Sequence, residues 1–89
     1  MIRREFEICN KLGLHARAAA KLVQCATRYR SHIEIERRDQ RVNCKSIMGV
    51  MMLAASQGTR VTVEAVGDDA EDAMASIETL IRERFGEAE

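Results

Sequence analysis

The sequence predicts an α+β fold in which helices cover one side of a mostly antiparallel β-sheet. Segments with alternating apolar residues are interspersed with segments whose apolar residues recur at helical spacing, in the order β-α-β-β-α-β-α. Each strand segment has one apolar face and each helix segment has one apolar stripe, which is typical of two packed layers. With 89 residues, no proline and no linker-like stretch, the chain is expected to form a single domain over residues 1–89.

The first strand is expected over Ile2–Cys9. Its inner residues are Ile2, Phe6 and Ile8, its outer residues are Arg3, Glu5 and Glu7, and Arg4 interrupts the inner face. A turn at 10–14 contains Gly13, and a helix follows from His15 to about Arg28. The apolar positions of this helix are expected to face the core, and its polar stripe consists of Arg17, Lys21, Gln24 and Arg28.

A β-hairpin is predicted over residues 31–44. The segment 31–37 alternates, with Ile33 and Ile35 directed inward and Glu34 and Glu36 directed outward. A polar turn at 38–40 then leads to a short strand around Arg41–Cys44. This succession of two short strands and a polar turn indicates antiparallel pairing.

A second helix is predicted to begin at Ser46 and to end at about Gln57, with Gly58 placed to stop it. Its main apolar stripe consists of Ile47, Val50, Met51 and Ala54. Met48 and Met52 lie on a different side of the helix. They either pack in the core or form an exposed, adaptable contact patch.

The last strand is predicted over Arg60–Val66, with Val61, Val63 and Ala65 on one face. A final helix follows. Asp68, with Glu71 three residues later, has the spacing of a capping box. We expect Gly86 to end this helix, and we expect its buried stripe to be Ala70, Ala73, Met74, Ile77, Leu80 and Ile81.

The composition excludes several classes of function. Fourteen basic and 14 acidic side chains cancel, so the whole molecule has no net field to attract nucleic acid or anionic lipid. No apolar run approaches the roughly 18 residues of a membrane span, and the N-terminus lacks the apolar core of a signal peptide. Cys9, Cys25 and Cys44 have no metal-ligand or C-x-x-C spacing, which indicates reduced thiols in a cytoplasmic protein. We expect neither a metal site nor a cofactor.

The run 11–22 is the most informative stretch for function. It places His15 where the first helix is expected to begin, and Arg17 follows two residues later. The first turn of a helix has unpaired backbone N–H groups and the positive end of the dipole, which suit a phosphate or another anion. A neutral imidazole there can act as a nucleophile and carry a phosphoryl group that the backbone and Arg17 hold. From spacing alone, the alternative is a capping or surface histidine.

Two strings resemble the histidine phosphocarrier family, the HPr-like carriers of the bacterial phosphoenolpyruvate phosphotransferase system. The string GLHARAAAKLV at 13–23 is similar to the active-site signature of the family, and NCKSIMGVMML at 43–53 is similar to its regulatory serine segment. The two strings lie at the spacing of the family, and the similarity extends from about Glu5 to Phe85. The resemblance implies an open-faced β-sandwich, with a four-stranded antiparallel sheet and three helices on one face.

The resemblance also implies a function and the residues that perform it. Nδ1 of His15 would carry the phosphoryl group, assisted by Arg17, with enzyme I as donor and an enzyme IIA-type protein as acceptor, in sugar uptake or its regulation. The protein would be a phosphocarrier rather than an enzyme, and a cytoplasmic monomer. Ser46 would be a regulatory site for a serine kinase, besides its structural role as a helix N-cap. Partners would dock on the first two helices, at Lys21, Lys45, Ile47, Met48 and Met51.

One departure from the family and two rival functions remain open. The family usually has proline where this chain has Ala18, which affects the stiffness of the helix start more than its chemistry. The same chemistry would also serve a nitrogen-related regulatory branch of the system. A protein that signals through Ser46 without phosphoryl transfer is a rival of another class, and the presence of His15 argues against it.

Overall fold

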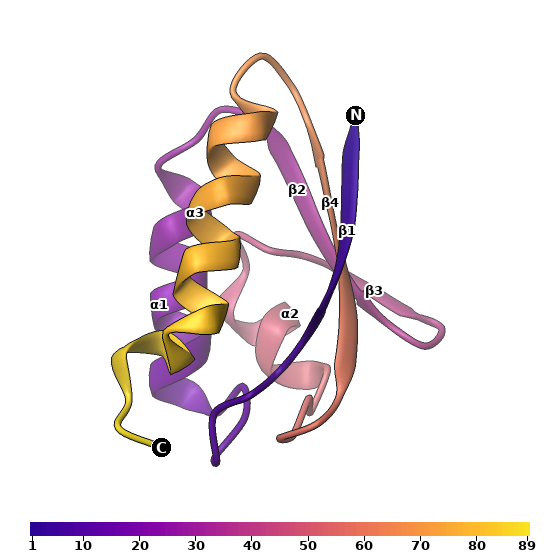
Figure 1. Cartoon of the computed structure of the whole chain (residues 1–89). Coiled ribbons are helices and arrows are strands. Elements are labelled where there is room, and N and C mark those ends of the chain that lie inside the picture. The colour runs from indigo at the N-terminus through magenta and orange to yellow at the C-terminus, as the bar shows by residue number, and fades with distance from the viewer.

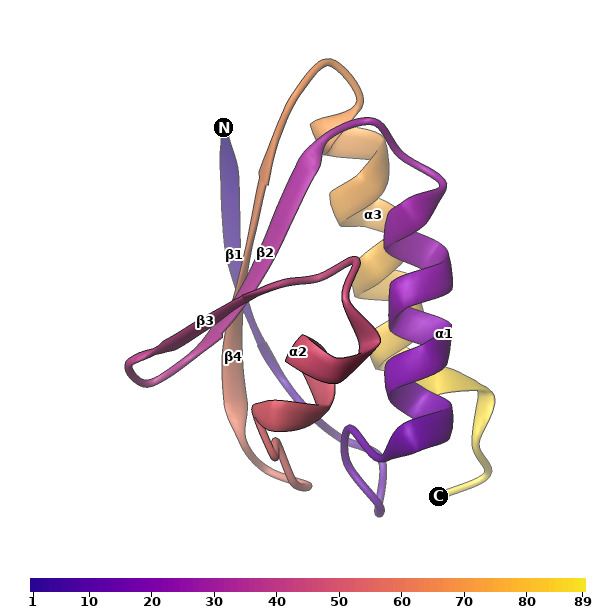
Figure 2. The same ribbon diagram turned by 180° about the vertical axis from the view of Figure 1, so that it is seen from behind.

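The computed structural model describes residues 1–89 and has two layers, a sheet and a layer of helices on one of its faces (Figures 1 and 2). The elements in chain order are β1 (Ile2–Glu7), α1 (Ala16–Thr27), β2 (His32–Arg37), β3 (Gln40–Asn43), α2 (Ile47–Met52), β4 (Arg60–Val66), α3 (Ala70–Arg82) and the 3₁₀ turn η1 (Arg84–Gly86). The predicted fold class and the predicted order β-α-β-β-α-β-α are confirmed.

The sheet places the last strand of the chain in a central position. The strands lie in the order β1-β4-β2-β3, and all neighbours are antiparallel. Phe6 lies opposite Val61, and Ile33 lies opposite Ala65, so the apolar faces predicted for these strands coincide. A shift of one residue would turn these side chains to solvent, which is why the alternation specifies the register.

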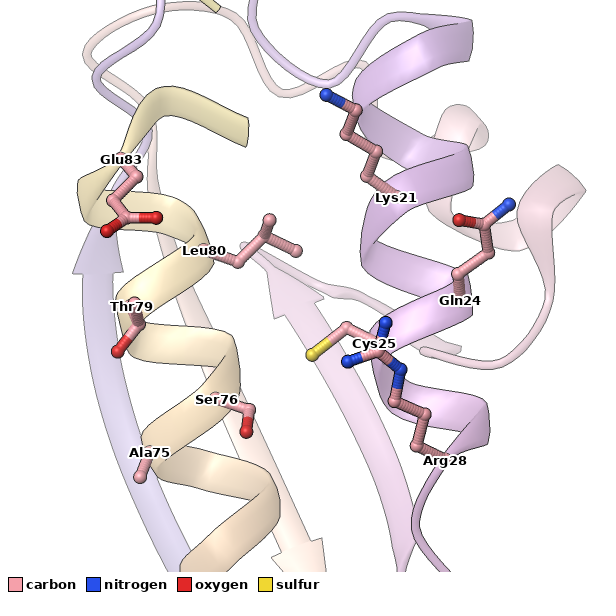
Figure 3. Close-up of a pocket in the computed structure, with 9 residues that line it drawn as sticks. All are labelled: Lys21, Gln24, Cys25, Arg28, Ala75, Ser76, Thr79, Leu80 and Glu83. Carbon is pink, nitrogen blue, oxygen red and sulfur yellow. The ribbon is translucent and has the colours of Figure 1, made fainter. Parts of the chain in front are cut away.

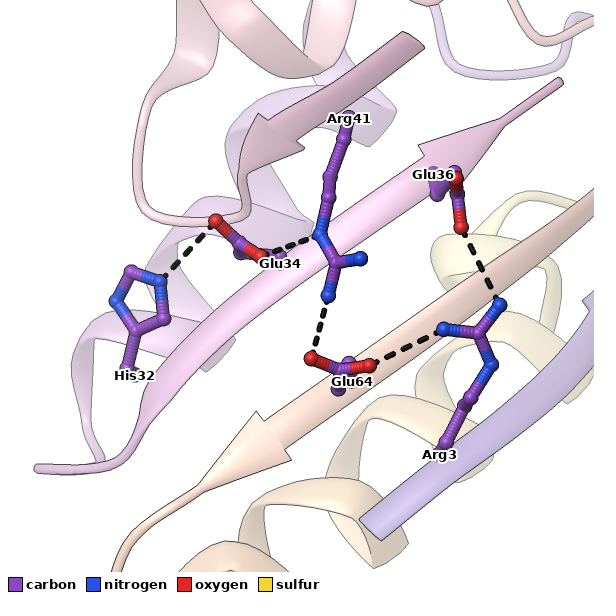
Figure 4. Close-up of polar contacts among 6 residues, drawn as sticks. All are labelled: Arg3, His32, Glu34, Glu36, Arg41 and Glu64. Carbon is purple, nitrogen blue, oxygen red and sulfur yellow. Dashed lines mark hydrogen bonds and ion pairs between the residues drawn. The ribbon is translucent and has the colours of Figure 1, made fainter. Parts of the chain in front are cut away.

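The face of the sheet without helices carries paired charges (Figure 4). Glu64 of β4 pairs with Arg3 at 3.1 Å and also with Arg41, whose guanidinium reaches Glu34 on β2. Glu34 in turn pairs with His32 at 3.2 Å. Exposed pairs of this kind contribute little to stability, because water and salt screen their charges. They leave this face polar, as the outward positions of these strands predict.

The core lies between the two layers and contains 22 buried apolar residues. The buried residues of α1 and α3 recur at helical spacing, as predicted, although Leu80 is only partly buried. Phe85, which lies beyond α3, is the largest fully buried side chain. Burial of a side chain of this size contributes about 1.5–3 kcal/mol, so it holds the chain that follows α3 against the core.

The second helix is shorter than predicted, because α2 ends at Met52 and not at about Gln57. The N–H groups of Leu53 and Ala54 bond to carbonyls only three residues earlier, which tightens the last turn. Ala54 then adopts a left-handed conformation with a φ of 51° and turns the chain out of the helix. This conformation usually belongs to glycine or asparagine, so an alanine carries no sequence signal for it.

Gly58 and the apolar stripe of α2 also differ from the prediction. Gly58 does not stop the helix but lies in the turn before β4, where its N–H donates to the Ile8 carbonyl at 2.7 Å. Within α2, only Val50 is buried. A helix of 6 residues turns too few side chains toward the core to bury a whole stripe, so Ile47 and Met51 remain exposed.

The start of α3 uses a different acid from the one predicted. The N-cap residue is Asp69 and not Asp68, and its side chain makes no capping hydrogen bond. The carboxylate of Asp69 accepts instead from the Ser31 hydroxyl and from the backbone N–H groups of Arg30 at 2.8 Å and Ser31 at 2.9 Å. The Ser31 hydroxyl first, and then the Arg30 amide, hold the pKa of Asp69 below its usual value. These bonds tie the loop after α1 to the start of α3.

The chain reverses direction after α3. The helix ends at Arg82, before the Gly86 that was expected to end it, and Arg84, Phe85 and Gly86 have φ values of 56°, 55° and 79°. These left-handed residues turn residues 84–89, the C-terminal segment, toward the N-terminal end of α1 (Figure 1). The segment that follows α3 therefore lies next to the start of α1, although the two are far apart in the sequence.

Candidate functional site

His15 begins the first helix, as predicted. It is the N-cap residue of α1, with an extended backbone, and its carbonyl accepts from Ala19 N–H at 2.8 Å. Its ring does not cap the helix, because the side chain makes no hydrogen bond to the first turn. The N–H groups of that turn thus have no side-chain cap, and an anion beside His15 would meet the positive end of the helix dipole.

The turn before His15 is fixed to the segment that follows α2. Leu14 N–H donates to the Ala55 carbonyl at 2.8 Å, and the Leu14 side chain is buried. Gly13 has a φ of 66°, and a Cβ there would lie 2.4 Å from the Ala55 oxygen. Only glycine permits this close approach, so Gly13 helps to position the histidine that follows.

The ring of His15 contacts a carboxylate from the other end of the chain. Nε2 of His15 pairs with Oε2 of Glu87, and Nδ2 of Asn10 donates to Oε1 of Glu87 at 3.0 Å. The Asn10 bond and then the His15 bond hold the pKa of Glu87 below its usual value of 4.5. The His15 side chain is 26% exposed and that of Glu87 is 12% exposed, so the pair is partly shielded and the ring remains accessible.

Sequence reasoning did not identify Glu87 or Asn10 as site residues. Glu87 lies beyond the stretch of similarity, and only the reversal of the chain after α3 brings it to His15. Asn10 had a weak signal, because an asparagine in a turn often bonds to nearby backbone. Its Nδ2 indeed donates to the Gly13 carbonyl at 2.8 Å, as well as to Glu87.

Arg17 lies exposed in the first turn of α1. Its charge contributes to the lowered pKa of Glu87, after the larger effects of the hydrogen bonds, so the guanidinium acts on the same carboxylate as His15. Arg17 also lines a hollow of about 480 Å³, together with Lys11, Leu12 and residues 86–89. The side chain is therefore next to the site and accessible from solvent.

Ser46 caps α2, as predicted. Its Oγ accepts from the N–H of Gly49 at 3.2 Å, and its side chain is partly exposed. A Cβ at Gly49 would lie 3.3 Å from this Oγ, so the small residue leaves room for the cap. The serine thus has a structural role that is complete without any modification.

Of the side chains predicted for partner docking, Lys21 lies on α1, Lys45 lies in the turn before α2, and Ile47, Met48 and Met51 lie on α2. The methionine pair of α2 is exposed, so of the two alternatives for Met48 and Met52, packing in the core is wrong. The exposed fractions are between 40% and 69% for the four residues that we call the α2 patch, which are Ile47, Met48, Met51 and Met52. Both lysines bond to backbone carbonyls: Nζ of Lys21 to Phe85 at 2.7 Å and Nζ of Lys45 to Tyr29 at 2.8 Å.

A groove of about 560 Å³ lies between α1 and α3, and no sequence pattern predicted it (Figure 3). The sulfur of Cys25 points across it toward α3, between Lys21 and Arg28 on the α1 side. Burial raises the pKa of the Cys25 thiol, which keeps the sulfur protonated and unreactive. His15 is not among the residues that line the groove.

The three cysteines are free thiols. No group of three or more His, Cys, Asp or Glu side chains is arranged to hold a metal ion. None of the helices has the length and apolar character needed to cross a membrane.

Comparison with known proteins identifies the family. Residues 2–83 match the family described as "PTS HPr component phosphorylation site". The phosphocarrier protein HPr of Cupriavidus necator is 52% identical over 89 residues, which are 100% of both chains. The crystal structure of HPr-C-His from Thermoanaerobacter tengcongensis has a TM-score of 0.96 and 47% identity, over 100% of both chains. A crystal structure of an HPr dimer from the same organism has a TM-score of 0.79 and 48% identity, over 98% of this chain and 100% of that one. The chain therefore belongs to the HPr family of phosphocarrier proteins of the phosphotransferase system.

Proposed function

We propose that the protein takes a phosphoryl group onto Nδ1 of His15 from an enzyme I-type donor and passes it to an enzyme IIA-type acceptor, in the cytoplasm. The position of His15 carries this proposal: it begins α1, its ring is partly exposed, and Arg17 follows in the first turn. Membership of a phosphocarrier family supports the same reaction class.

Two sources of positive charge act on the arriving group. The first turn of α1 presents backbone N–H groups at the positive end of the helix dipole, and the Arg17 guanidinium adds a full charge. Both would interact with the phosphoryl oxygens. A carrier has to release its group, so moderate binding serves it better than a closed and tightly binding pocket. The exposed position of Arg17 is consistent with such moderate binding.

Partners would recognise the α2 patch together with Lys45, just before α2, and Lys21 on α1. An exposed, apolar surface rich in methionine adapts to more than one partner, which suits a protein that meets a donor and an acceptor in turn. Lys21 directs Nζ to the Phe85 carbonyl and Lys45 directs Nζ to the Tyr29 carbonyl, so each charge is held in a fixed place rather than dispersed in solvent. Acidic partner surfaces would be attracted to them.

The two histidines of the chain allow a matched test of the acceptor. Incubation with phosphoenolpyruvate and a cognate enzyme I should add one acid-labile, alkali-stable phosphate to the unmodified protein. We expect the same phosphate on a His32→Ala variant, because His32 lies exposed on the sheet, and none on a folded His15→Ala variant. Persistent labelling of His15→Ala would contradict the proposal.

A further inference from the structure

The C-terminal segment is held against the start of α1 at both of its ends. Phe85 is fully buried, and its carbonyl accepts from Nζ of Lys21 at 2.7 Å. At the other end, the carbonyl of Glu89 accepts from the N–H of Lys11, and their side chains form an ion pair at 3.4 Å. Glu87 lies between these two attachments. Its contact with the site is therefore built into the fold and does not belong to a free tail.

Asn10 fixes the orientation of the Glu87 carboxylate. Its Nδ2 donates to the Gly13 carbonyl at 2.8 Å and to Oε1 of Glu87 at 3.0 Å. Both partners are acceptors, so the amide cannot be turned round without directing its own oxygen at two other oxygens. The side chain of Asn10 is fully buried, which excludes bulk water as an alternative donor to Oε1 on that side.

The second carboxylate oxygen determines which nitrogen of His15 bears the proton. Oε2 of Glu87 pairs with Nε2 of His15, and an ionised carboxylate only accepts hydrogen bonds. The pKa of Glu87 lies below its usual value, so the group is ionised at neutral pH. Nε2 therefore bears a proton, and in the neutral ring Nδ1 keeps the free electron pair.

We propose that Glu87 is a positioning residue for His15. It keeps the ring in the tautomer whose Nδ1 is the nucleophile, and it stabilises the positive charge that the ring acquires with the phosphoryl group. This inference rests on the proposed function of His15 and adds the series Asn10–Glu87–His15 to it. In nucleophilic sites a histidine is commonly oriented by a carboxylate, and that carboxylate is held in turn by a further group.

The transfer step shows why the charge of Glu87 matters. The electron pair of Nδ1 forms a bond to phosphorus, and the bond between phosphorus and the donor breaks, with its electron pair leaving on the donor. Nε2 keeps its proton, so a neutral imidazole becomes a phosphorylated imidazolium. The carboxylate of Glu87 lies against the protonated side of that ring. When a nucleophile of the acceptor attacks phosphorus, the bond to Nδ1 breaks and its electron pair returns to the ring, which becomes neutral again.

Glu87→Gln tests this role because it changes the hydrogen bonding and little of the shape. Asn10 donates, so the glutamine would direct its carbonyl oxygen at Asn10 and its NH₂ group at His15. An NH₂ group donates as well, so Nε2 of His15 would have to accept, and the ring proton would move to Nδ1. The matched control is Glu89→Gln, which removes the same charge and a weak, exposed ion pair from the same segment but keeps the backbone bond to Lys11 that holds the segment in place.

Nitrogen-15 NMR of the imidazole reads the tautomer directly in the unphosphorylated protein, at a pH where the ring is neutral. We expect the proton on Nε2 in the unmodified protein and in Glu89→Gln, and mainly on Nδ1 in Glu87→Gln. Phosphoryl uptake from enzyme I should fall roughly tenfold or more in Glu87→Gln, or about 1.4 kcal/mol of barrier. In Glu89→Gln it should stay within about twofold.

The outcomes separate this inference from the proposed function. An unmodified protein with its proton on Nδ1 would overturn the inference, and so would a Glu87→Gln variant with unchanged tautomer and uptake. In both cases phosphorylation of His15 would stand. If the proposed function fails instead, His15 takes up no phosphate, and the NMR measurement still reports the tautomer that Glu87 imposes.

Discussion

At the scale of single residues, Ser46 is the position where a small chemical change should alter docking without altering the fold. Ser46→Asp keeps an oxygen that can cap α2 and adds a negative charge next to the α2 patch. We expect phosphoryl uptake from enzyme I to slow by roughly tenfold, about 1.4 kcal/mol, because the new charge would repel an acidic partner. Steady-state kinetics at physiological salt would measure the change.

Two further variants separate charge from structure at this position. Ser46→Ala removes the cap and should lower stability by about 1 kcal/mol while uptake stays near normal. Gln40→Glu adds the same charge at the first residue of β3, outside the α2 patch, and should leave uptake unchanged. Equal kinetics for Ser46→Asp and Gln40→Glu would leave Ser46 with only its structural role.

The residues of the site differ in how far the sequence predicts them. His15 and Ser46 are predicted to begin helices, and the structure finds both as N-caps, because the start of a helix has a local signature. Glu87 has no such signature. Its position next to His15 depends on left-handed backbone at Arg84 and Phe85, and arginine and phenylalanine do not predict that conformation.

At the scale of elements, the carboxylate of Asp69 joins the loop after α1 to the start of α3 and should make stability depend on pH. Its pKa in the folded protein lies below the usual 3.8, so the stabilisation is fully present above that value and is lost as the pH falls through the lowered pKa. At neutral pH, Asp69→Asn should therefore melt at a lower temperature than the unmodified protein. The difference should narrow as the pH falls below 3.8.

The neighbouring acid supplies the control for this measurement. Asp68→Asn removes the same charge next to α3 but touches none of the bonds to Arg30 and Ser31. Its melting temperature should stay close to that of the unmodified protein across the same pH range. A difference for Asp69→Asn that stayed the same across this pH range would show that the ionisation of Asp69 contributes nothing to stability.

The sequence predicts an element well when its apolar pattern repeats over many residues. It predicts the end of an element poorly when that end depends on the conformation of a single turn. The alternation in β4 and the stripe of α3 extend over most of their lengths. The strand is found with the expected bounds and the helix with the expected stripe, although the helix ends at Arg82. The end of α2 depends on Ala54 alone. The capping box at Asp68 fails for a tertiary reason, because the neighbouring Asp69 binds the distant Ser31.

At the scale of the whole molecule, the structure predicts a monomer. Both edges of the sheet are poor templates for pairing: β3 has 4 residues, and β1 carries charges at Arg3, Arg4, Glu5 and Glu7. The α2 patch belongs to a helix of 6 residues, whereas a stable interface buries about 800 Å² per partner. Sedimentation equilibrium at tens of micromolar should give a mass near 10.0 kDa. Twice that mass would contradict the prediction and align this chain with the dimeric relative.

The one-sided helix layer has a consequence for timing. His15, Ser46 and the α2 patch belong to the helix layer, while the opposite face of the sheet presents paired charges. The donor and the acceptor would then have to use the same side of a domain whose longest extent is 33 Å. They could then not both be bound while the group is handed on, so the protein would have to leave one before it meets the other. The flux through such a relay would depend on how quickly each complex dissociates, and an excess of either partner would act as a competitive inhibitor of the other.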